Sequence, residues 1–148
     1  MGNELHNQAE RYGSSRVVVG MVDNDKRLSD IPKLRPFNEV VLRCDEPGSM
    51  FVVYRHQALP THYLIVLHPA CDAWIYGAAQ AAGISPATHG LPAALPDFLI
   101  FTKKILAEER PEIVALLKAL RRSPSPAYAQ LLAFINERLQ DANQPVWP

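Results

Sequence analysis

Two aspartates, Asp23 and Asp25, directly follow an apolar run that ends at Val22. Carboxylates two residues apart at the end of a buried strand can share a hard divalent cation such as Mg²⁺, which keeps several waters and takes few protein ligands. Such an ion could stabilise the transition state of a phosphoryl transfer. Aspartate and asparagine also favour turns, so the same segment could simply close a bend after the strand.

A second polar pair follows another apolar run, 62–67: His68 stands at its end, and Asp72 lies in the first turn of the helix expected next. If the two strands are parallel, both polar pairs lie at one edge of the sheet, where ligands bind in open α/β sheets. The alternative interpretation is structural. His68 would cap the helix, and Asp72 would complement its dipole.

Basic side chains follow the aspartates, with Lys26 directly next to Asp25. Lys26 and its basic neighbours could hold phosphates, which makes nucleic acid a candidate partner, or they could form a solvated surface. The sequence contains no GxSxG motif, no glycine-rich phosphate loop and no CxxC pair. Asp23 and Asp25 are the metal-binding candidates because of their place at a strand end, with Lys26, His68 and Asp72 in support.

The composition favours one ordinary globular domain: the chain has 148 residues, 48% of them apolar, and equal numbers of acidic and basic side chains, 15 each. This balance gives no overall attraction to nucleic acid or to an anionic membrane. His68, Pro69 and Asp72 interrupt the most apolar stretch, 63–83, so no membrane partner is expected. Cys44 and Cys71 are expected to be buried, reduced thiols in a cytoplasmic protein.

Hydrophobic periodicity predicts a helix, four strands and then four helices. The first strand, 16–22, is apolar on both faces, which suits a central strand covered on both sides. We expect a mixed, mostly parallel sheet followed by a helical C-terminal half, all in one α/β domain over 1–148. Residues 1–82 would hold the sheet-containing core, and 83–148 the helical part packed on it. The expected helices are 3–12, 69–82, 97–106, 111–122 and 125–139, and the later strands are 37–43, 50–54 and 62–67.

Two segments, "VVVGMVDND" and "HYLIVLHPACDAWI", carry a resemblance to the Toprim fold of topoisomerases, primases and nucleases, and to small uncharacterised Toprim-like bacterial proteins. The resemblance covers about 17–82 and implies a Mg²⁺ site at Asp23 and Asp25, with Asp72 where a glutamate is usual. The family also has a catalytic glutamate at the end of an earlier strand. Here Glu4 and Glu10 lie in a predicted helix, so that glutamate has no match.

The leading hypothesis is therefore a cytoplasmic Toprim-like domain that binds a divalent metal at Asp23 and Asp25, with enzymatic activity left open. The rival hypothesis is a non-catalytic interaction or accessory module, which would use its C-terminal helices and could form a homodimer. Strand edges without a neighbour would favour pairing with a partner. A small-molecule-binding α/β domain is a third alternative.

Overall fold

The computed structural model describes residues 16–104 and 109–141. The helix predicted for 3–12, the end of the one predicted for 97–106 and the tail after Asp141 lie outside these residues. Over the two described ranges, no helix is both long enough and apolar enough to cross a membrane.

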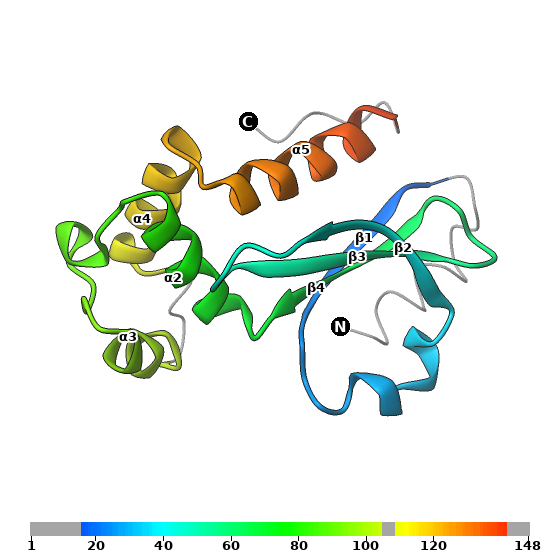
Figure 1. Ribbon diagram of the computed structural model, residues 1–148, viewed down its shortest axis with the longest axis horizontal. Coiled ribbons are helices and arrows are strands. Elements are labelled where there is room, and N and C mark those ends of the chain that lie inside the picture. The colour runs from blue at the N-terminus through cyan, green and yellow to red at the C-terminus, as the bar shows by residue number, and fades with distance from the viewer. Residues whose placement is uncertain (1–15, 105–108, 142–148) are drawn as a thin grey trace.

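The sheet has four strands in the spatial order β1-β4-β3-β2 (Figure 1). Their bounds are Val18–Asp23 for β1, Phe37–Cys44 for β2, Met50–His56 for β3 and His62–His68 for β4. β1 and β4 run parallel, whereas the β4–β3 and β3–β2 pairs are antiparallel. The α/β class and the mixed sheet are confirmed. The expectation of a mostly parallel sheet is wrong, because short turns connect β2, β3 and β4 and reverse the chain each time.

β1 does not occupy the central position that its sequence suggests. It lies at one edge of the sheet, and β4 lies beside it in the interior. Six of the seven residues of β4 are buried, whereas in β1 only Gly20 is buried. An apolar run on both faces indicates that both faces are covered, but it does not reveal how many strands flank it.

Among the described residues of the C-terminal half, four helices follow, as predicted. They are α2 (Cys71–Ala81), α3 (Leu95–Thr102), α4 (Pro111–Arg122) and α5 (Pro126–Asp141), with short 3-10 turns η2 (Leu28–Asp30), η3 (Pro32–Leu34) and η4 (Pro86–His89) between elements. α4 has the predicted bounds. α2 begins two residues later than predicted, because Ala70 is extended and serves as its N-cap, which leaves Pro69 outside the helix.

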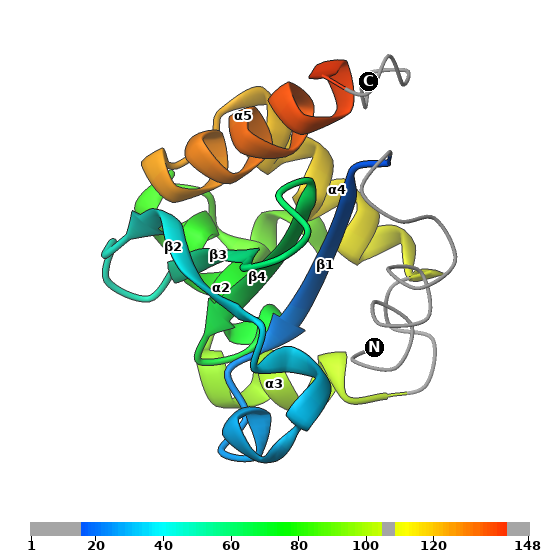
Figure 2. The same ribbon diagram turned by 90° about the vertical axis from the view of Figure 1, so that its right-hand side faces the viewer.

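The sheet separates two apolar layers of unequal size. The larger layer joins Phe51 and Ile65 of the sheet to Phe98, Leu116 and other side chains of the four helices. The smaller layer, around Leu34, lies on the opposite face, where η2 and η3 cover Leu64 and Val66. Figures 1 and 2 show α5 lying across one face of the sheet, away from the blue turns that follow β1.

The turn between β2 and β3 anchors two helices. An added Cβ at Gly77 of α2 would stand 2.0 Å from the carbonyl oxygen of Gly48 in this turn. Oε2 of Glu46, from the same turn, accepts hydrogen bonds from the Ser49 hydroxyl at 2.6 Å and from the Ala127 N–H of α5 at 3.3 Å. The turn therefore sets how closely α2 approaches the sheet and where α5 begins.

We expect Gly77→Ala to destabilise the protein by about 3 kcal/mol or more, because the new methyl group meets backbone that cannot move aside. Alanine would otherwise favour a helix interior by about 1 kcal/mol. Gly83→Ala is the control: it has open space around it but a φ of +70°, which should cost roughly 1–2 kcal/mol. Urea denaturation measures both. An unchanged or increased stability of Gly77→Ala would contradict the close approach.

Candidate functional site

The parallel pairing of β1 and β4 brings the two polar motifs to one edge of the sheet. Asp23 lies opposite Leu67 in the register. The next residue, Asn24, donates its N–H to the Leu67 carbonyl at 2.8 Å. The two strands therefore run in the same direction, which is what convergence of the motifs requires. Asp23, Asp25 and His68 all lie where the two strands end.

Asp23 joins the end of β1 to the start of α2. Its Oδ1 accepts a hydrogen bond from the Cys71 N–H at 2.7 Å. The first N–H groups of a helix have no partner within the helix, and the N-cap residue Ala70 supplies no side-chain cap. The Asp23 carboxylate takes that role from 48 residues away, and its negative charge also suits the positive end of the helix dipole.

Asp25 closes the turn after β1. Its Oδ1 accepts the Arg27 N–H at 3.0 Å. Its own N–H donates to the Asp23 carbonyl at 2.8 Å, and its carbonyl accepts the Leu28 N–H at 3.0 Å. These hydrogen bonds are typical of an aspartate that stabilises a turn, which is the alternative interpretation given for this segment.

His68 and Asp72 do not form one cluster with the aspartates. Asp72 accepts hydrogen bonds from the Ala73 N–H at 2.8 Å and from the Thr102 hydroxyl of α3 at 2.9 Å. His68 shares a cavity of about 600 Å³ with Asp25 and Lys26. Its Nε2 is buried and has no hydrogen-bond partner among the described residues. Burial, and then the nearby charge of Arg43, lowers the pKa of His68, so the neutral ring is favoured.

The donor set at this edge suits a metal ion only weakly. Within the described ranges, no three histidine, cysteine, aspartate or glutamate side chains come together as a metal-binding group. Asp23 and Asp25 each use Oδ1 for a backbone N–H, which leaves Oδ2 of each for another partner. Two carboxylate oxygens could bind a largely hydrated Mg²⁺, but they do not build an ordered catalytic centre.

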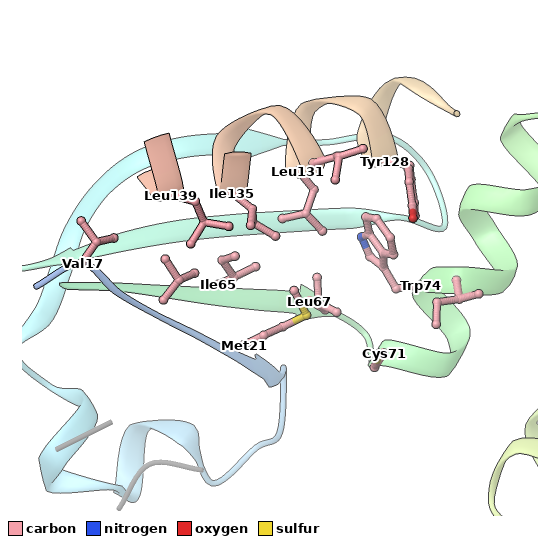
Figure 3. A pocket seen from close by; sticks show the side chains of 13 residues that line it. Val17, Met21, Ile65, Leu67, Cys71, Trp74, Tyr128, Leu131, Ile135 and Leu139 are labelled. Atoms are coloured by element: carbon pink, nitrogen blue, oxygen red, sulfur yellow. The ribbon is translucent and has the colours of Figure 1, made fainter. Parts of the chain in front are cut away.

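An apolar groove lies nearby, on the face of the sheet that α5 covers (Figure 3). It has a volume of about 440 Å³ and runs between β1, β4, α2 and α5. Val17, Val19 and Met21 line one side, and Leu132, Ile135 and other α5 side chains line the other. None of the residues that line it is charged. We call this space the β1–α5 groove.

Trp74 and Tyr128 lie at the α2 end of the β1–α5 groove (Figure 3), with their ring centroids 6.3 Å apart. Trp74 is only 2% exposed, yet its Nε1 donor has no hydrogen-bond partner in the described structure. A buried donor left without a partner costs about 1–3 kcal/mol. Burial raises the pKa of the Tyr128 hydroxyl, so it keeps its proton near neutral pH.

Sequence reasoning missed this groove, although its signals were present. Its lining residues lie mainly in the predicted strand 16–22 and the predicted helix 125–139, but the sequence does not show that these two segments pack side by side. The cysteine prediction is half right: both thiols are free, Cys44 is buried, and Cys71 is exposed at the groove. The pKa of Cys71 is raised, first by partial burial and then by the charges of Asp23 and Asp72, which disfavours the reactive thiolate.

Comparison with known proteins adds no assignment: no family model, no curated protein and no solved structure matches this chain.

We expect Asp23→Ala to lower the free energy of unfolding by about 1 kcal/mol, since it removes the side-chain acceptor of the Cys71 N–H at the start of α2. Asp23→Asn should cost less, because its amide oxygen can still accept the Cys71 N–H. Asp25→Ala is the matched control on an exposed turn and should change stability by less than about 0.5 kcal/mol. Urea denaturation ranks the three variants, and equal losses in Asp23→Ala and Asp25→Ala would show that Asp23 is no cap.

Proposed function

We propose that this protein is a non-catalytic interaction module that accepts an extended apolar segment of a partner along the outer edge of β1. The observation that carries the proposal is the contrast between β1 and β4. Both strands are apolar on both faces, a pattern typical of strands inside a sheet. Of these two strands, only β4 has a strand on each side within the described sheet. A fifth strand would give β1 the same environment.

The backbone of β1 is oriented to accept such a strand. Val18 donates its N–H to the Thr61 carbonyl at 3.0 Å, and Asn24 donates to Leu67 at 2.8 Å. Because successive residues of a strand direct their N–H groups to opposite sides, those of Val19 and Met21 point away from β4. Peptide segments bind to sheet edges through such outward N–H and C=O groups.

The two edges of the sheet differ in how they are protected. Natural edge strands avoid unwanted pairing through charges, prolines and bulges. β2, at the other edge, contains Glu39 and Arg43 and has two irregularities in its register with β3. β1 has neither charge nor proline from Val18 to Val22. An edge left without these devices is suited to binding a strand.

Both faces of an added strand would meet apolar surface. On one face, Val19 and Met21 line the β1–α5 groove. On the other, Val18 and Val22 pack against the smaller apolar layer. The preferred partner segment is therefore apolar at successive positions. A second copy of this chain, whose own β1 meets that description, is one such partner. The two free thiols support a cytoplasmic location as part of this proposal.

We expect Val19→Pro to weaken strand binding by about tenfold or more, since proline removes an outward N–H and adds bulk at the pairing edge. The probe is an unlabelled peptide with the sequence of residues 16–25, added to ¹⁵N-labelled protein while β1 amide exchange and shifts are followed by NMR. Val19→Ala shortens the same side chain but keeps the N–H, so it should still bind.

Val18→Pro is the matched backbone control, because it removes an N–H that bonds to β4. It should destabilise the fold by about 1–3 kcal/mol, whereas Val19→Pro should change stability less. Absence of peptide-induced protection in β1, or equal binding by Val19→Pro and Val19→Ala, would reject strand addition. Light scattering shows whether a second copy occupies the edge.

A second candidate function is weak divalent-metal binding at the ends of β1 and β4. It is favoured by the convergence of Asp23, Asp25 and His68 at one edge, and the Toprim resemblance implies a Mg²⁺ site at Asp23 and Asp25. Lys26 lines the same cavity as Asp25, and nucleic acid would be the partner of this candidate alone. In the described chain no strand precedes β1, so the family's catalytic glutamate has no counterpart there, and phosphodiester chemistry is not proposed.

Millimolar Mg²⁺ should shift the backbone amide resonances around Asp23 and Asp25 if this second candidate holds. Asp25→Asn tests the charge separately from the turn, because it removes a negative charge while keeping a side-chain oxygen for the Arg27 N–H. The shifts should therefore weaken severalfold without loss of the turn. No shift near either aspartate at millimolar Mg²⁺ would eliminate the metal site and leave the interaction module unaffected.

A further inference from the structure

We propose that the β1–α5 groove is a binding site for an uncharged, mainly hydrocarbon molecule whose polar group accepts a hydrogen bond from Trp74. This inference goes beyond strand addition, because it depends on the face of the sheet and on a buried indole rather than on the edge. The volume of about 440 Å³ falls within the range of roughly 300–1,000 Å³ that small-molecule sites occupy.

The indole of Trp74 points to an acceptor on the ligand. Figure 3 shows its nitrogen on the side of the ring that faces Leu131 and Leu67, both of which line the groove. The nitrogen is shielded from water and has no hydrogen-bond partner within the described residues. Buried tryptophan N–H groups usually have a partner. The oxygen of a ligand in the groove would supply one after a small shift of the neighbouring side chains, because the nitrogen has no surface open to a water-sized atom in this structure.

The residues that line the groove indicate the charge, polar group and shape of the ligand. No charged side chain faces the groove, so an ionised carboxylate or amine placed deep inside would lose its hydration without gaining a counter-ion. A ketone, ester or neutral amide carbonyl is the class of polar group that fits. The line from Val17, just before β1, to Met21 within it is about 13 Å long, which suits a single extended alkyl chain rather than a fused ring system.

NMR of the full chain tests this directly, with 2-decanone as the probe and decane as the control that lacks an acceptor. Trp147→Phe leaves the indole of Trp74 as the one tryptophan signal, since the sequence has two tryptophans. We expect 2-decanone to shift that indole N–H downfield and to bind about tenfold more tightly than decane. Both probes should shift amides of β1 and α5.

Two variants test the Trp74 N–H donor and the free volume of the groove independently. Trp74→Phe keeps an aromatic ring but removes the N–H, so the preference for 2-decanone over decane should fall to about one. Ile135→Phe fills the groove and should abolish binding of both probes, whereas Val40→Phe, at a position 53% exposed on β2, should leave binding unchanged. If the indole N–H of Trp74 does not move with 2-decanone, the assigned acceptor is wrong. If neither probe shifts groove amides, another segment or a second copy fills the groove and the proposal fails.

Discussion

The parallel pairing of β1 with β4 determines where the candidate functional features of this protein lie. It brings the ends of both strands, and with them Asp23, Asp25 and His68, to one edge of the sheet. It also leaves β1 with one described neighbour and places the apolar residues of β1 under α5. An antiparallel β1 would separate the polar motifs and move its aspartates to the opposite end of β4.

The polar edge shows how one residue pattern can satisfy two explanations. Aspartates at a strand end are what a Mg²⁺ site needs, and also what a turn and a helix N-terminus need. Here the hydrogen bonds of Asp23 and Asp25 serve the backbone, while the apolar groove contains a donor whose partner the described residues do not supply. For these reasons we propose recognition of an apolar partner rather than catalysis at the strand ends.

Features governed by local chemistry were predictable from the sequence. α4 has the predicted bounds, because proline, an apolar stripe and charges that suit the dipole all agree over Pro111–Arg122. The residues Asp45, Glu46, Pro47 and Gly48 are typical of a turn, and β2 and β3 on either side of them are paired neighbours. The edge position of β1 was not predictable, since a strand's own residues report burial of its faces and not the number of its neighbours. The capping role of Asp23 and the groove were equally hidden, because each depends on side chains far apart in the sequence.

The bond between Asp23 and the Cys71 N–H also has a consequence for the order in which the chain folds. The helix α2 follows β4 almost directly, but its cap comes from a strand 48 residues earlier, and contacts between distant residues form late because closing the intervening loop costs entropy. The first turn of α2 should then become firm only after β1 has docked. In the mature protein, any fluctuation that lifts β1 would loosen the start of α2 with it, so the two segments should open and close as one cooperative unit.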